Sequence, residues 1–566
     1  MREVFGMILF WITILFCKHL VETKGKIDKK FSLPITFTVI GLLEFFLGLI
    51  HLLKIGTWIW MGIILIVGIV EMIKGNLKIK KEDFLNPTNV MISLIFLGIT
   101  IAGYSLHLTH YDNFSHWGLI IKSMLETNQL PNASTNYIMF KSYQPGSACF
   151  LYFLGLLCGK KEGFMIIAQN YLIFSYITVL FHYIPKERKW FGYPMVILFS
   201  VFLTITSTIS FNNLLVDSLL SVMLIATCII LYEYRKNLKK AVLTALPIMI
   251  YLFAVKNTGI LLNGILCLLI LVFGWNKGKK KESTRYVFYI MGMIIFLLLI
   301  WSIHVKLSYG SGALSSKHSF SPQNFYLSLK ALGLNNLLNF LKLYWFHLWE
   351  WNNNIPNQYM FFLNISLILY AIYQKNRKVV KWILGINAIY LLYYVILGGM
   401  YILSMPWEEA KVFAGFTRYM MMTVNAFVGM TIFYFFQNKT KKIPYVLGIV
   451  LLIVPIYFHS HELKVFIGKD GYQGSIIEKV DQVMDEIPRE KENYYFYSPS
   501  SKEDFGYLSH VAIYKLLKKN VFVITKKEDF YSLKTNSCLI ILEETNMEEE
   551  ILPLEKISKN IYQSSR

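Results

Sequence analysis

The sequence predicts an all-α polytopic membrane protein of about 14 spans, followed by a small C-terminal α/β domain outside the cytoplasm. Of the 566 residues, 55% are hydrophobic and 16% are aromatic, and the mean hydropathy is +0.47. Many apolar runs approach the roughly 20 residues that a helix needs to cross a bilayer. Because lipid cannot satisfy backbone polar groups, we expect these spans to be helical.

Fourteen apolar runs are long enough to be considered as spans. The first of them lacks a small-residue cleavage site, so we interpret it as a retained span and not as a signal peptide. The predicted spans are 4–20, 32–53, 58–73, 87–108, 164–184, 190–211, 214–232, 241–256, 258–273, 286–307, 357–373, 382–402, 417–436 and 443–459.

The distribution of charge predicts the orientation of these spans. The formal net charge is +21, but acidic residues outnumber basic ones beyond residue 460, so the positive excess belongs to the short connections between spans. Such connections face the cytoplasm. The small basic clusters carry no nucleic-acid-reading module, so we expect no nucleic acid partner. The most basic connections are 24–30, 74–81, 186–189, 235–240, 277–281, 375–381 and 439–442.

Placing all these connections in the cytoplasm gives a self-consistent path with both termini outside. The path requires that residues 145–159 do not cross the membrane. The apolar run Ala148–Leu157 is too short for a full span, and we expect it to lie at the outer surface. If it crossed, the basic connection 186–189 would face outward.

Four polar clusters, far apart in the sequence, then fall at span ends on the outer side. They are the loop 110–146, the turn 212–217, the turn 256–259 and the segment 407–419. Chance would scatter such clusters over both faces, so their common side predicts an external active site. Six cysteines show no spacing typical of zinc ligands, and we expect neither a zinc site nor a disulfide framework.

Asp112 and His116 are four residues apart and would share one face of a helix. A carboxylate near the membrane surface is costly unless it is solvated, paired or used. Asp112 could cap a helix that begins near Ser115, or it could act as a general base that removes a proton from a hydroxyl group. The residues alone leave both interpretations open.

The pattern Asp112-Asn-Phe-Ser-His-Trp117, in a loop that ends Tyr143-Gln-Pro-Gly146, resembles the first outer loop of the bacterial GT-C superfamily of membrane glycosyltransferases. The cluster at Asp217 and the motifs Lys256-Asn-Thr-Gly259 and Phe416-Thr-Arg-Tyr419 are similar to further motifs of that superfamily. Asp112 occupies the place of its essential acidic residue.

Two features depart from the family pattern. Asn113 stands where a second acidic residue would be expected, and about three spans precede the loop where one is usual. Together with the change of composition after residue 460, the resemblance predicts three parts. They are accessory membrane helices (1–86), a GT-C-like transmembrane catalytic module with outer loop 110–162 (87–460), and an extracytoplasmic α/β domain (461–566).

The resemblance implies an inverting, polyprenyl-phosphate-sugar dependent glycosyltransferase in the cell membrane. It would move a monosaccharide to a cell-surface glycan, wall polymer or glycolipid on the outer face of the cytoplasmic membrane. Asp112 would be the catalytic residue. The expected substrate-binding residues are His116, Gln144, Asp217, Lys256, Arg418 and Tyr419. No metal ligand is assigned, and a divalent cation stays open as a cofactor.

Lys256 and Arg418 lie at span ends, where basic side chains often reach past the lipid to the headgroups. Alternatively they would clamp the phosphate of a lipid carrier, arginine through two oxygens and lysine as a point charge. Asp217 would position them, bind a sugar hydroxyl or complete a polar turn. Glu408 and Glu409 beside Trp407 favour a solvated loop over a sugar site.

Two other functions remain as alternatives. One is a polysaccharide polymerase that joins lipid-linked repeat units, which would also need outer arginines. The other is a non-enzymatic flippase for a lipid-linked sugar, for which two-fold pseudo-repeats and charges deep within spans would be typical. The sequence shows neither of the flippase features.

Two further segments are expected on the outer side of the membrane. The loop 308–356 ends in the aromatic run 344–351, which favours an interfacial helix at headgroup level. Beyond residue 460 the composition changes. There the segments 494–497, 521–524 and 539–542 predict strands, and 509–519 predicts a helix between two of them.

Overall fold

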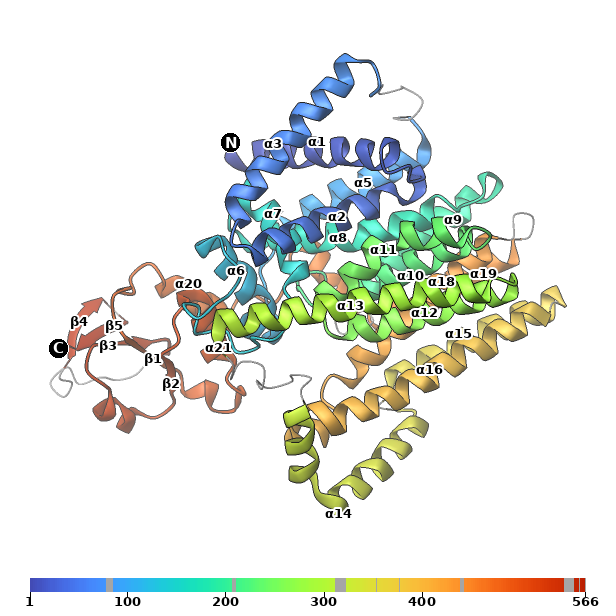
Figure 1. Ribbon diagram of the computed structural model, residues 1–566. Coiled ribbons are helices and arrows are strands. Elements are labelled where there is room, and N and C mark those ends of the chain that lie inside the picture. Colours follow the sequence, from blue (N-terminus) through green and yellow to red (C-terminus); the bar gives the residue numbers. More distant parts are fainter. Residues whose placement is uncertain are drawn as a thin grey trace.

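The computed structural model contains a helix within each of the fourteen predicted spans (Figure 1). It describes residues 1–77, 85–205, 210–310, 322–352, 354–375, 377–437, 442–543, 554–558 and 560–564. The helices are α1 (Arg2–Thr23), α2 (Lys29–Leu49), α3 (Leu53–Ile73), α5 (Pro87–Gly103), α8 (Glu162–Phe181), α9 (Lys189–Ile205), α10 (Asp217–Glu233), α11 (Leu238–Val255), α12 (Thr258–Asn276), α13 (Lys280–Tyr309), α15 (Ile355–Gln374), α16 (Arg377–Ser404), α18 (Phe416–Phe436) and α19 (Ile443–Phe458).

Within the described residues, ten of these helices are long and apolar enough to cross a membrane, and an eleventh follows if α19 is counted with the short helix Ser460–Ile467, from which it is bent by 81°. The chain is therefore a multi-pass membrane protein. Helices α5, α9 and α10 have 17 residues each. The predicted span 87–108 overran α5 because Leu106 and Leu108 are apolar but are buried in the loop that follows.

Several predicted segments lie partly outside the described residues. They are residues 78–81 of the basic connection 74–81, residues 206–209 of the predicted span 190–211, residues 311–321 of the loop 308–356, residue 376 of the connection 375–381, residues 439–441 of the connection 439–442, and residues 544–553, 559 and 565–566 of the C-terminal segment.

Helix α7 (Gly146–Cys158) occupies the segment 145–159. It has 13 residues, too few to cross a bilayer, as the sequence predicts. It is buried against α1, α2 and α8 along nearly its whole length. A helix that is apolar on every side must be covered on every side. Gly6 of α1 allows this, since a Cβ there would come within 2.4 Å of the Leu157 carbonyl oxygen.

The predicted interfacial segment forms the end of α14 (Pro322–Trp349), which stands beside α16 and away from the main bundle (Figure 1). The helix is broken at Gly333, whose φ is 67°. Tyr344 joins α14 to α16, because its hydroxyl donates to the Tyr394 carbonyl oxygen at 2.7 Å and the two rings stack.

The C-terminal segment forms a five-stranded sheet in the order β2-β1-β3-β5-β4. Strands β1 (Asn493–Tyr497), β2 (Val521–Ile524) and β3 (Ser537–Ile541) are parallel, and β4 (Leu554–Ser558) and β5 (Ile561–Ser564) complete it with antiparallel pairs. The three predicted strands correspond to β1–β3. Strands β4 and β5 were missed because both are short and rich in polar residues.

This sheet lies beyond one end of the helical bundle (Figure 1). Helix α21 (Tyr507–Leu516) joins the two parts by packing against the loop that follows α5. The Lys515 ammonium bridges Glu162 of α8 at 3.0 Å and Asp481 at 2.9 Å. The C-terminal segment is thereby held against the end of the bundle to which the loop 110–146 belongs.

Candidate active site

The loop 110–146 is tied to the turn before α10. After Asp112 the chain forms a single π-helical turn, Asn113–Trp117, and continues as α6 (Gly118–Thr127). The buried Asn113 carboxamide oxygen accepts the backbone N–H of Leu214 at 3.0 Å. Asn212 donates in turn to the His107 carbonyl oxygen at 2.9 Å. Asn113 thus holds the loop in place.

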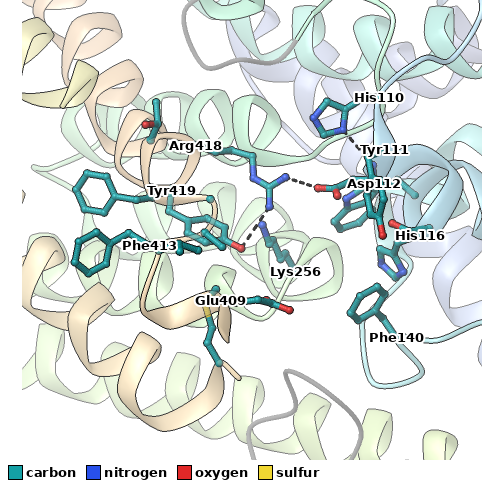
Figure 2. Close-up of a pocket in the computed structure, with 18 of the residues that line it drawn as sticks. His110, Tyr111, Asp112, His116, Phe140, Lys256, Glu409, Phe413, Arg418 and Tyr419 are labelled. Atoms are coloured by element: carbon teal, nitrogen blue, oxygen red, sulfur yellow. Dashed lines mark hydrogen bonds and ion pairs between the residues drawn. The ribbon is translucent and has the colours of Figure 1, made fainter. Parts of the chain in front are cut away.

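Four charged residues from four distant segments meet at this end of the bundle, and Figure 2 shows three of them, Asp112, Lys256 and Arg418. The Lys256 ammonium lies 2.9 Å from one carboxylate oxygen of Asp217. Arg418 places Nε 3.4 Å from the other oxygen of Asp217 and pairs through Nη1 with Asp112. The cluster alternates carboxylates and cations, and Asp217 is only 3% exposed. The described structure gives Asp112 no helix-capping hydrogen bond, so its partner is Arg418.

Three of these charged residues are positioned by the ends of helices. Asp217 is the first residue of α10, where the helix dipole favours an anion. Lys256 follows the last residue of α11 with an extended backbone, and α12 begins two residues later. Gly259 makes this sharp connection possible, because a Cβ there would lie 1.9 Å from the Leu252 carbonyl oxygen. Arg418 lies in the first turn of α18. The Lys-Asn-Thr-Gly sequence therefore fixes where Lys256 points.

The cluster opens into a cavity of about 720 Å³, a size that suits a sugar phosphate. Asp112, Lys256, Arg418 and Tyr419 line it. The Tyr419 hydroxyl accepts from Arg418 Nη2 at 3.4 Å, and the Lys256 ammonium lies 5.0 Å from the centre of its ring. The remaining wall is largely aromatic and includes Trp117, Phe140, Tyr143, Phe413, Phe416 and four histidines, His110, His116, His347 and His510.

Asp112 is ionised at neutral pH. Burial acts to raise the pKa of its carboxyl, but the nearby Arg418, His110 and Lys256 outweigh burial and hold that pKa below its usual value. His110 Nδ1 accepts the backbone N–H of Asp112 at 3.1 Å. The carboxylate is therefore an ionised hydrogen-bond acceptor at the edge of the cavity.

His116 is enclosed by aromatic rings and is 4% exposed. Its ring meets those of Phe140 and Tyr143 edge-on at 5.3 and 5.0 Å. Burial lowers the pKa of the imidazole to about 3, so the ring is neutral and offers one donor and one acceptor. Neither nitrogen has a hydrogen-bond partner among the described residues. Such orphaned groups suit the hydroxyls of a bound ligand.

Two predicted binding residues lie behind the cavity wall. Gln144 is buried and donates to the Asn257 side chain at 2.7 Å, and Asp217 is covered by its two cations. Neither lines the cavity. Gln144 supports the turn that carries Lys256, and Asp217 holds Lys256 and Arg418 at a fixed separation.

Three residues that line the cavity were not assigned to a site from the sequence. Tyr111 adjoins Asp112 and could have been found from that position. His510 lies on α21, and nothing in its own surroundings in the sequence links it to the cavity. Glu409 also lines the cavity, although the sequence favoured a solvated loop there.

The residues present do not fit a bound divalent cation. The two carboxylates of the cluster already pair with a guanidinium and an ammonium group. Among the described residues no group of three His, Cys, Asp or Glu side chains could hold a metal ion. Magnesium and related ions need several free oxygen ligands.

Comparisons with known proteins do not assign a function to this chain. No protein-family model and no curated protein matches the chain. Among solved structures it is similar to the crystal structure of ArnT from Cupriavidus metallidurans bound to undecaprenyl phosphate. That likeness has 11% sequence identity and a TM-score of 0.37, and it covers 85% of this chain and 98% of the other. At these values it carries no inference about function.

Proposed function

We propose that the protein is a membrane glycosyltransferase that moves a monosaccharide from a polyprenyl-phosphate donor to a hydroxyl group on the outer face of the cytoplasmic membrane. The observation that carries the proposal is the meeting of one ionised carboxylate, Asp112, with two fixed cations, Lys256 and Arg418, at a single cavity. These are the groups that such a transfer requires, and the GT-C resemblance of the sequence motifs supports the same assignment.

The two cations act on the leaving phosphate. As the bond between the anomeric carbon and the phosphate oxygen breaks, the polyprenyl phosphate departs as a monoester and gains negative charge. Arg418 and Lys256 are held in place by Asp217 before the reaction begins. Cations that need no rearrangement stabilise this developing charge more than the ground state, which lowers the barrier.

Asp112 acts on the acceptor. The acceptor oxygen forms the new bond to the anomeric carbon, and its proton passes to the Asp112 carboxylate. In the ligand-free arrangement Arg418 pairs with Asp112. A donor phosphate competes for the same guanidinium, so donor binding loosens this pair and strengthens Asp112 as a base. His116 offers hydrogen bonds to the transferred sugar, and Gln144 and Tyr419 hold Lys256 and Arg418 in position.

A direct test is to reconstitute the purified full chain in lipid vesicles with radiolabelled sugar donors. We expect sugar release from a polyprenyl monophosphate donor and none from a nucleotide sugar, because the cavity lies at a membrane-associated bundle end and carries two phosphate-binding cations. The assay is run with a chelator and with Mg²⁺, and equal rates are expected. Turnover confined to a lipid diphosphate donor, with growing products, would instead identify a polymerase.

The pH dependence of kcat/KM is expected to follow the ionisation of the Asp112 carboxyl. Because its pKa lies below the usual value for an aspartate, the base is ionised at neutral pH and becomes protonated only as the pH falls through that depressed pKa. We expect kcat/KM to stay flat through the neutral range and to fall only once the pH drops below the usual pKa of an aspartate. A profile of kcat/KM in vesicles measures this. A fall centred near pH 6.5 would point to a histidine base in place of Asp112.

A further inference from the structure

The C-terminal segment forms part of the cavity wall. His510 of α21 and Tyr111 of the first outer loop both line the cavity that contains Asp112, and their rings meet edge-on at 5.0 Å. The Tyr111 ring also stacks on that of Tyr507 at 6.3 Å. Two segments nearly 400 positions apart thus build one wall beside the proposed base.

An exposed aromatic side chain belongs to the turn that contacts this wall. The Tyr111 hydroxyl donates to the Phe505 carbonyl oxygen at 3.4 Å, and the Phe505 side chain is 94% exposed. Asp504 accepts the backbone N–H groups of Gly506 and Leu508 at 2.8 and 2.9 Å, which fixes the turn that presents Phe505. A fixed and exposed phenyl ring next to a cavity is a surface on which a sugar ring can stack.

The charges around this wall have one sign. Burial and the charges of Asp112, Asp504 and Glu409 raise the pKa of the Tyr111 hydroxyl. Burial lowers the pKa of His510, and the charges that oppose this shift are those of Asp112 and Asp504. All are carboxylates. The cations of the cluster, Lys256 and Arg418, both contact Asp217, and Arg418 also pairs with Asp112. Both cations gather around Tyr419 (Figure 2). A phosphate would be attracted to the cationic side of Asp112 and repelled from the aromatic side.

We infer that the acceptor is an uncharged sugar ring, received in a subsite formed by Tyr111, His510 and Phe505, and not a phosphate-bearing polymer. This inference rests on the proposed transferase function. The leaving phosphate occupies the side of Lys256 and Arg418, so an acceptor that attacks from the opposite side of the donor sugar approaches Asp112 along the aromatic wall. The rings stack on its apolar face, and His510 and Tyr111 exchange hydrogen bonds with its hydroxyls.

The experiment compares two acceptor classes in the reconstituted full chain with a saturating polyprenyl-phosphate sugar. The uncharged probes are short-chain alkyl glycosides of glucose, galactose, mannose and N-acetylglucosamine, and the anionic probe is an oligomer of glycerol phosphate. The variants are His510→Ala and Phe505→Ala. The matched control is His461→Ala, since His461 is exposed and does not line the cavity.

We expect transfer to at least one alkyl glycoside and none to the glycerol phosphate oligomer. In His510→Ala and Phe505→Ala the acceptor KM should rise about tenfold, the expected loss for one stacking or hydrogen-bonding contact. The donor KM should stay unchanged, which a general loss of folding would not produce, and the control should match the parent protein in both values.

Transfer to the glycerol phosphate oligomer in preference to every glycoside would overturn the inference, as would an unchanged acceptor KM in both variants. Donor hydrolysis without transfer to any of the four glycosides would also count against it, while leaving the transferase proposal standing. Absence of any donor cleavage would refute the proposed function itself, and the acceptor subsite with it.

Discussion

Replacing Asp112 by asparagine is expected to lower kcat by roughly 10²–10⁴-fold, the usual contribution of a general base. Asparagine keeps the shape of the side chain and an oxygen that can accept from Arg418, but it cannot take the acceptor proton. The donor KM should change little, because Lys256 and Arg418 still pair with Asp217. Release of labelled polyprenyl phosphate from the vesicle-bound donor gives both kinetic values.

Glu126→Gln is the matched control for this variant. Glu126 belongs to the same outer loop, pairs with Lys160 at the surface and does not line the cavity. Its neutralisation should leave kcat unchanged. Undiminished kcat in the Asp112 variant would remove the residue from the role of base, and an equal loss in both variants would indicate that the charge of the loop matters more than the position of one carboxylate.

Replacing Arg418 by lysine is expected to lower kcat/KM for the donor by about 10²–10³-fold, the usual cost of losing one group that stabilises transition-state charge. The guanidinium reaches Asp112, Asp217 and Tyr419 at once through different nitrogens. A lysine ammonium is a point charge on a flexible stem and cannot hold that arrangement. Alanine is less informative, since removal of one partner of a buried ion pair costs about 3–5 kcal/mol of folding free energy.

Three measurements separate the effects of this substitution. The thermal unfolding midpoint reports folding, kcat/KM reports donor recognition and catalysis, and the pH profile reports Asp112. Without the guanidinium the pKa of the Asp112 carboxyl should rise, so the acid limb of the profile should move to higher pH. Lys411→Ala is the control, because Lys411 pairs with Glu408 at the surface of the neighbouring segment. Unchanged kcat/KM in the lysine variant would contradict the phosphate clamp.

The membrane helices could be predicted because their signal is local. A run of about 20 apolar residues has few alternatives to a membrane helix, and a helix was found in each of the fourteen predicted spans. The same reasoning failed where apolar residues serve another purpose. Leu106 and Leu108 are buried in a loop. Hydropathy records that a residue avoids water, and it does not tell whether lipid or protein covers that residue.

The sequence by itself determined that the chain is a polytopic helical protein, and it pointed to Asp112, Asp217, Lys256 and Arg418 through their places at helix ends. Only the tertiary structure decided that these four side chains pair with one another, that Gln144 lies behind the cavity, and that His510 lines it. Charged residues at helix ends can be recognised from the sequence because each stands next to an apolar run, where an unpaired and unsolvated charge is costly. Which partner relieves that cost depends on how distant segments pack, and no local pattern encodes that choice.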